Sequence, residues 1–190
     1  MGCRLYLVSP PVIDHPSIFA ADFRAALDGG DVAAFLLGLD GDEAAITRVA
    51  DTLRPVCQQR DVGFFLNGRP DLAVKLDCDG VEIGPADYGA ARRVLGSGRQ
   101  IGVRCPSSRH LAMEAADAGA DYVAFDKTEL ELIEWWSELF ETPCVAAGAI
   151  TLDNAKPLIA AGADFLAVAD GIWNHEGGPK EAVARFNELF

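Results

Sequence analysis

The sequence has few of the residues that build metal centres and disulfide frameworks. Among its 190 residues are 3 histidines and 5 cysteines, and no two cysteines form a Cys-x-x-Cys pair (Cys3, Cys57, Cys78, Cys105, Cys144). A structural zinc site or a disulfide scaffold needs closely spaced ligands or paired cysteines. We therefore expect reduced thiols and a cytoplasmic location.

Basic residues are also scarce. Sixteen lysines and arginines stand against 29 aspartates and glutamates, which gives a formal net charge of −13. Nucleic acid and anionic membranes both favour a basic face, so we expect neither as a partner. No apolar run approaches the about 18 residues of a membrane span, and we expect no signal peptide. A metalloprotease motif, a nucleophile elbow and a P-loop are absent from the sequence.

Hydrophobic residues, in contrast, make up half of the chain, which is enough for one large core. The segment 142–172, TPCVAAGAITLDNAKPLIAAGADFLAVADGI, shows how they are arranged. Two short apolar runs enclose a stretch that Thr151 or Asp153 can cap as a helix. Such strand–helix–strand units indicate a parallel sheet that is buried on both faces.

A related pattern occurs four times, as a small residue or glycine, an aspartate and an apolar strand. The aspartates are Asp31, Asp79, Asp121 and Asp164, and a spacing of roughly 45 residues holds two strand–helix units. Further apolar runs fill the gaps, so eight units follow one another. Eight units favour a closed (β/α)8 TIM barrel over an open sheet, with short loops and a single domain over residues 1–190.

The active sites of such barrels lie at the carboxyl ends of the strands, and this rule selects the candidate residues. Several have a purely structural alternative: Asn67 as a turn residue, Asp87 as a helix cap, and Arg104 and Lys127 as members of an ion network. Glu82 points into the barrel mouth if Val81 faces the helices. The candidates are Asn67, Arg69, Glu82, Asp87, Arg104, Asp126, Lys127, Gly148, Ala149 and Asp170.

Three segments carry a family resemblance: the opening LYLVS, the central FFLNGRPDLAVKLDCDGVEIGPAD and the late TPCVAAGAITLDNAKPLIAAGADFLAVADGI. They are similar to the first strand, to the central asparagine and glycine motifs and to the phosphate-binding end of one family. The chain thus resembles the thiamine-phosphate synthase family, which includes the thiazole tautomerase branch. The resemblance runs nearly from end to end.

The resemblance implies a reaction that joins hydroxymethylpyrimidine diphosphate to thiazole phosphate with Mg²⁺. Releasing diphosphate requires cations and metal-binding carboxylates, and here the sequence departs from the family. The basic motif after the second strand aligns with residues 36–40, LLGLD, which carry neither Arg nor Lys. One of two expected metal-binding carboxylates aligns with Gly68. The histidine of the fourth strand aligns with Glu82, the serine of the fifth with Arg104, and the tautomerase histidine with Pro106.

The phosphate-binding end departs as well. Its paired glycines align with Gly148 and Ala149, and its serine aligns with Asp170, which would repel a phosphate. The family positions that remain are Asn67, the metal ligand Asp87 and Gly148. Arg69, Arg104 and Lys127 are candidate replacements for the missing basic residues.

Three hypotheses follow. The first is a family member with an eroded phosphate site, whose synthase activity is weak or lost and which binds a small phosphorylated or heterocyclic ligand or acts in regulation. The second is an active synthase with rearranged basic residues. The third is a barrel isomerase that uses Glu82, Asp126 and Lys127. Trp135, Trp136 and Trp173 form either a packed patch or the face of a homo-oligomer.

Overall fold

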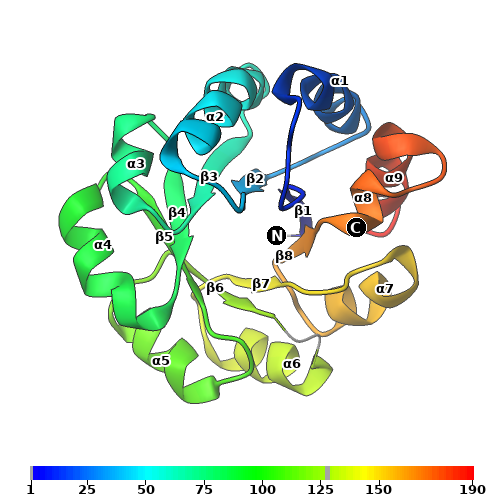
Figure 1. The fold of residues 1–190 in the computed structure, drawn as a ribbon. Coiled ribbons are helices and arrows are strands. Elements are labelled where there is room, and N and C mark those ends of the chain that lie inside the picture. The colour runs from blue at the N-terminus through cyan, green and yellow to red at the C-terminus, as the bar shows by residue number, and fades with distance from the viewer. Residues whose placement is uncertain (1, 127–128) are drawn as a thin grey trace.

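The computed structural model describes residues 2–126 and 129–190, and in it parallel strands close into a barrel. Each strand pairs with the next in the chain, and β8 pairs with β1. Figure 1 looks along the barrel, with the helices in a ring around the strands. The expected (β/α)8 barrel is confirmed. The strands are β1 (Arg4–Val8), β2 (Ala34–Leu37), β3 (Gly63–Asn67), β4 (Gly80–Ile83), β5 (Gln100–Arg104), β6 (Tyr122–Phe125), β7 (Cys144–Ala146) and β8 (Phe165–Val168).

The helices follow the strands along the chain, and a short 3-10 turn, η1 (Pro85–Asp87), precedes α4. None of the described helices is long and apolar enough to cross a membrane. They are α1 (Pro16–Leu27), α2 (Glu43–Gln58), α3 (Pro70–Lys75), α4 (Tyr88–Leu95), α5 (Arg109–Asp117), α6 (Leu130–Leu139), α7 (Leu152–Ala160), α8 (Asp170–Trp173) and α9 (Gly178–Asn187).

Two hydrophobic cores result from the alternation of side chains along each strand. The outer core lies between the strands and the helices and contains, for example, Val81 and Ile83 of β4. The alternate residue Glu82 therefore faces the barrel interior, as expected. The inner core consists of Tyr6, Leu36, Phe65, Tyr122, Ala124, Val145 and Ala167.

Three of the four repeated aspartates have a common structural role at the amino ends of the strands. In three of the four repeats the carboxylate accepts a hydrogen bond from a backbone N–H at the preceding strand, which ties neighbouring strands together. These bonds join Asp79 to Phe64 (2.7 Å), Asp121 to Ile101 (2.7 Å) and Asp164 to Cys144 (2.8 Å). Asp31 differs, because it binds the Arg4 side chain. The sequence repeat thus marks a recurring bond between strands.

Three local features complete the helical ring. Helix α1 begins at Pro16, with His15 as its N-cap. Pro55 lies inside the last turn of α2, which continues to Gln58. The chain forms a short helix, α8, directly after β8.

The tryptophans lie on α6 and α8 and pack against the outer core. Trp136 is fully buried and stacks on Phe140, with ring centroids 4.0 Å apart. Trp173 donates from Nε1 to the backbone oxygen of Val8 at 2.7 Å, and Trp135 lies beneath the Arg109 guanidinium. Trp135 and Trp136 pack with Phe140, whereas Trp173 packs with Phe19 and Phe23, so the tryptophans belong to two aromatic groups rather than to one patch. Oligomerisation stays a prediction.

Candidate active site

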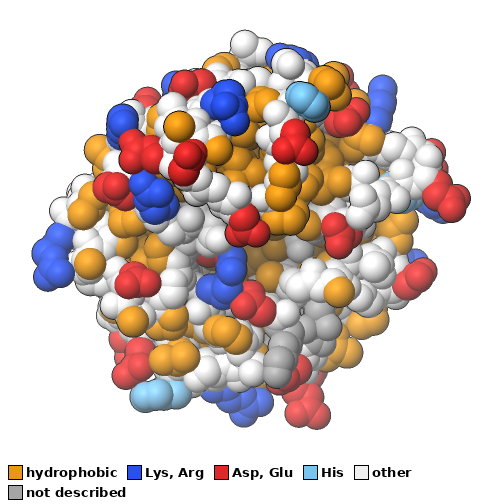
Figure 2. Space-filling view, viewed as in Figure 1, with side chains coloured by type: hydrophobic (Ala, Val, Ile, Leu, Met, Phe, Trp, Pro, Cys, Tyr) orange, Lys and Arg blue, Asp and Glu red, His pale blue; other side chains and the backbone are white. Residues whose placement is uncertain are grey.

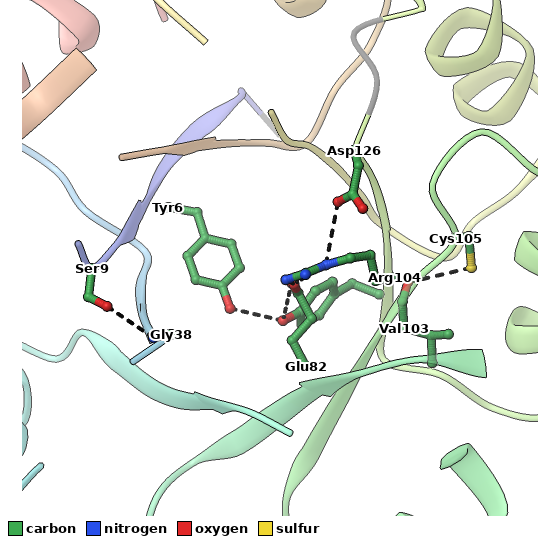
Figure 3. Close-up of polar contacts among 9 residues, drawn as sticks. Tyr6, Ser9, Gly38, Glu82, Val103, Arg104, Cys105 and Asp126 are labelled. Carbon is green, nitrogen blue, oxygen red and sulfur yellow. Dashed lines mark hydrogen bonds and ion pairs between the residues drawn. The ribbon is translucent and has the colours of Figure 1, made fainter. Parts of the chain in front are cut away.

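Three candidate residues meet at the carboxyl end of the barrel, which is called the mouth below. Arg104, the last residue of β5, lies between Glu82 of β4 and Asp126, the residue that follows β6. Arg104 Nε and Nη2 both donate to Glu82 Oε1, and Nε lies 3.4 Å from Asp126 Oδ1. Figure 3 shows the arginine between the two acids. Adjacent strands bring these residues together, because Glu82 is in register with Gly102 and Arg104 with Ala124.

Two tyrosines continue this network into the barrel. The Tyr122 hydroxyl donates to Glu82 Oε2 at 3.2 Å, and the hydroxyls of Tyr122 and Tyr6 are 2.9 Å apart. Because Tyr122 uses its single hydrogen on Glu82, Tyr6 must donate to Tyr122. Glu82 itself is only 4% exposed. Its two carboxylate oxygens are thus held from opposite sides, by Arg104 toward the mouth and by Tyr122 from below.

Burial dominates the acid–base properties of this cluster. It raises the pKa of Glu82, although Arg104 and Tyr122 act in the opposite direction. Burial also raises the pKa of Asp126 and keeps those of Tyr6 and Tyr122 well above the ordinary value. Burial by itself lowers the pKa of Arg104, but the neighbouring Glu82 and Asp126 contribute to a net rise above the ordinary value, so the arginine stays charged. The cluster therefore combines one cation with two carboxyl groups of unusually high proton affinity.

Two other candidates lie near the mouth but outside this cluster. Asn67 ends β3 in register with Glu82, and its side chain is exposed. Asp87 is exposed at the end of η1.

Arg69 is tied to the neighbouring helices. It forms ion pairs with Glu43 at 3.3 Å and with Asp71 at 3.6 Å. To bind a ligand in the mouth, Arg69 would have to leave both Glu43 and Asp71. Lys127 lies outside the described residues.

The end of the barrel after β7 is shaped by a close backbone approach. Gly148 has a φ of 108°, and a Cβ at this position would lie 2.5 Å from the backbone oxygen of Asp126. Only glycine fits such a conformation and such a contact without strain. Ala149 follows in the exposed loop, where its oxygen accepts from Asn154. The expected close approach at Gly148 is thus made to the neighbouring strand end.

Acidic residues surround the position after β8. Asp170 is exposed at the start of α8, and its Oδ1 accepts from Asn174 at 3.3 Å. A hollow beside it is lined by Asp153, Asp170, Glu176 and Glu181 together with Arg185. Figure 2 shows acidic and basic side chains next to one another around the centre of the mouth face. Among the residues that the structure describes, this part of the rim has no surplus of positive charge with which to bind a phosphate.

The described residues of the mouth offer few ligands for Mg²⁺. The described residues contain no group of three or more acidic, histidine or cysteine side chains arranged to hold a metal. Mg²⁺ accepts one or two carboxylates together with water and substrate phosphates. Asp87 could supply one such ligand, and a bound diphosphate would have to supply others. Mg²⁺ binding stays a prediction.

Sequence reasoning missed Tyr6 and Tyr122. A signal was present at Gly102, which is in register with Tyr122. A Cβ on Gly102 would lie 1.9 Å from the Tyr122 ring, so the glycine makes room for the tyrosine inside the barrel. When a glycine and a tyrosine lie opposite each other on adjacent strands and both face inward, the tyrosine side chain is expected to extend across the barrel interior.

The opposite, amino end of the barrel contains a cavity of about 470 Å³. It is lined by inner-core side chains, including Tyr6, Phe65 and Tyr122, and by Arg4 and Gln100 near its opening. The charged side chains at this end are already bonded within the protein, as shown for Arg4 and the repeated aspartates. We therefore place the candidate active site at the mouth, where Glu82, Arg104 and Asp126 converge.

Comparison with known proteins agrees with the resemblance seen in the sequence. The family model described as thiamine monophosphate synthase matches residues 5–172. The thiamine-phosphate synthase of Rhodospirillum centenum is 51% identical over 202 residues, covering 98% of this chain and 97% of the relative. That of Erythrobacter litoralis is 46% identical, covering 97% and 94%.

A solved structure, thiamine phosphate pyrophosphorylase from Pyrococcus furiosus, superimposes with a TM-score of 0.86 at 26% identity, covering 98% of this chain and 94% of that one. The family model, the near full-length relatives and the shared barrel agree. The chain therefore belongs to the thiamine-phosphate synthase family and is a thiamine-phosphate synthase-like protein of thiamine biosynthesis.

Proposed function

We propose that this protein binds thiamine precursors in the barrel mouth and that its synthase turnover is much slower than that of ordinary synthases. The observation that carries this proposal is the position of Arg104 between Glu82 and Asp126. A diphosphate leaving group needs cations that are free to bind it. An arginine already paired with two carboxylates must first give up one of them.

The charge at the rim supports the same proposal. Asp170 begins α8 directly after β8, at the end of the barrel where such folds frequently bind a phosphate. Arg69 is paired with Glu43 and Asp71. Losing one charged donor from such a site typically costs about 3 kcal/mol of transition-state stabilisation, which is more than a hundredfold in rate. Fewer available cations should slow the transfer while leaving heterocycle binding intact.

A second candidate function is that of a fully active thiamine-phosphate synthase. The 51% identity to a relative of that name, over nearly the whole of both chains, favours it. In this case Arg104 would leave Glu82 when the substrate binds, and Asp87 would hold Mg²⁺. The family match points away from the isomerase hypothesis, although Glu82 and Asp126 remain candidates for proton transfer.

A direct assay separates the two functions. Purified protein is incubated with hydroxymethylpyrimidine diphosphate, thiazole phosphate and Mg²⁺, and thiamine phosphate is measured beside an ordinary synthase. We expect binding of the pyrimidine precursor in calorimetry and turnover at least about a hundredfold below the reference. Turnover at the reference rate that Asp87→Ala abolishes would establish the active synthase. Absence of binding of either precursor would contradict both functions.

A further inference from the structure

Glu82 is an unusual residue for the interior of a barrel. It is 4% exposed, and below it lie Tyr6, Phe65 and Tyr122, whose rings pack with centroids 6.0 to 6.1 Å apart. Burying a carboxylate is costly unless hydrogen-bond donors surround it. Here the Tyr6–Tyr122 pair directs a donor at Oε2 and so fixes the carboxylate in one orientation. The other oxygen, Oε1, faces the mouth.

The partner at Oε1 is held in a suboptimal way. An arginine and a carboxylate pair most strongly as two forks, with each oxygen accepting one N–H. In this site both Nε and Nη2 of Arg104 donate to the same oxygen, because Tyr122 occupies the other. The Arg104 side chain is 37% exposed and already lies near Asp126. It can therefore leave Glu82 for Asp126 or for an anion once another donor takes its place at Oε1, so that the buried carboxylate keeps a partner.

The Arg104 guanidinium also shows what kind of group fits Oε1. It is a flat group whose N–H donors meet that one oxygen. A planar heterocycle with an amino group also offers an N–H donor at the edge of a flat group. An anionic substituent on that heterocycle would meet the displaced guanidinium.

We propose that Glu82, held by Tyr122 and Tyr6, is the specificity-determining carboxylate of the mouth, and that it accepts hydrogen bonds from a planar amino-substituted heterocycle that displaces Arg104. Arg104 then turns to Asp126 and to the anionic group of the ligand. This inference rests on the proposed function and deepens it, since it names the residue that selects the heterocycle.

The test uses simple probes with the full chain at about pH 8, where ordinary carboxyl groups are ionised. Binding of 4-aminopyrimidine, of pyrimidine and of inorganic diphosphate is measured separately by NMR titration. The wild-type protein should bind 4-aminopyrimidine about tenfold more tightly than pyrimidine, as expected for hydrogen bonds to a charged acceptor. Glu82→Gln should reduce this preference to within about twofold.

Arg104→Ala gives the sharpest outcome, because it should have opposite effects on two probes. Removing the group that occupies Oε1 should tighten 4-aminopyrimidine binding severalfold, whereas inorganic diphosphate should bind more weakly. If the pair were only structural, loss of Arg104 would weaken both probes or neither, and that result would overturn the proposal. Glu114→Gln, at an exposed carboxylate of α5, is the matched control for Glu82→Gln.

Two further measurements keep the outcomes distinct. Circular dichroism shows whether each variant folds, and Tyr122→Phe, which keeps the ring and removes only the hydroxyl, should also lower the preference for 4-aminopyrimidine if Glu82→Gln does not fold. The protein could prefer 4-aminopyrimidine over pyrimidine in a way that depends on Glu82 and yet not bind hydroxymethylpyrimidine diphosphate. That result would refute the proposed function but not the role of Glu82. Binding of the diphosphate that is insensitive to Glu82→Gln would refute the role of Glu82 alone.

Discussion

Arg104 donates two hydrogen bonds to a single oxygen of Glu82, while the second oxygen of Glu82 accepts from Tyr122. This arrangement joins a half-exposed cation to a buried acid near the axis of the barrel. Its two partners contribute unequally, because Glu82 is buried by the barrel itself, whereas Arg104 also reaches Asp126 at the mouth. Substitutions at the two positions should therefore change the stability relative to the wild type in opposite directions as the pH rises.

Truncation of the arginine should destabilise the protein. Arg104→Ala leaves the Glu82 carboxylate buried with only Tyr122 as a donor, which should lower the free energy of unfolding by about 1 to 3 kcal/mol at pH 7. The loss should be smaller at about pH 5, because the raised pKa of Glu82 allows the carboxyl group to take up a proton. Urea unfolding at both pH values measures the difference. An equal loss at both would mean that Glu82 does not titrate in this range.

Replacement of the acid should change the pH profile of stability. Because burial raises the folded-state pKa of Glu82, the folded protein binds more protons than the unfolded one between the two pKa values. This group therefore makes the free energy of unfolding fall as the pH rises from the ordinary value of about 4.3 through the raised one. Glu82→Gln removes that contribution. Its stability relative to the wild type should increase from pH 4.5 to pH 8, and a constant difference in urea unfolding would contradict the burial effect.

A methyl group at Gly102 should disrupt the inner core. The Cβ of Gly102→Ala would lie 1.9 Å from the Tyr122 ring, so the ring must leave its position above the β5 backbone. We expect a loss of about 1 to 3 kcal/mol, as is usual for overpacking in a core. The Glu82–Tyr122 hydrogen bond should be lost as well. Gly98→Ala is the matched control, because nothing lies within 4 Å of a Cβ there, and a similar loss in both variants would show that the effect is not steric.

The repeated aspartates should each stabilise the junction between two strands. Asp164→Ala removes the acceptor of the Cys144 N–H and leaves that donor without its partner at the start of β7. The expected loss is about 1 to 3 kcal/mol in thermal or urea unfolding. Asp117→Ala, at an exposed position at the end of α5, should change stability by less than about 0.5 kcal/mol. Equal effects of the two substitutions would show that the hydrogen bond from the Cys144 N–H to Asp164 does not stabilise the protein.

A side chain at Gly148 should separate the ends of β6 and β7. Gly148→Ala would bring a Cβ within 2.5 Å of the Asp126 oxygen at a φ of 108°, so the backbone must shift. Asp126 lies at the edge of the candidate site, and its contact with Arg104 should weaken with this shift. We expect lower stability and tighter binding of inorganic diphosphate, because Arg104 would then have one carboxylate partner fewer. Gly2→Ala, where a Cβ meets nothing within 4 Å, is the control, and unchanged diphosphate binding in Gly148→Ala would show that Asp126 had kept its place.

The barrel, its strand order and the set of rim residues follow from the sequence. Apolar runs at regular intervals, each followed by a helical segment, permit few folds, and the repeated aspartates mark the amino ends of the strands at Asp79, Asp121 and Asp164. Alternation along β4 was enough to place Glu82 inside, because its neighbour Val81 must face the helices. These features are local or periodic, so they can be read directly from the amino-acid sequence.

The contacts inside the mouth were decided only by the closed barrel. Tyr6 and Tyr122 are 116 residues apart, and closure brings their hydroxyls to 2.9 Å. The sequence left Arg104 as either a ligand for phosphate or part of an ion network, and the register of β4, β5 and β6 places it between Glu82 and Asp126. Sequence periodicity assigns a side chain to a face of a strand. Which side chains meet across the interior depends on the stagger and tilt of all the strands together, and these are properties of the complete barrel.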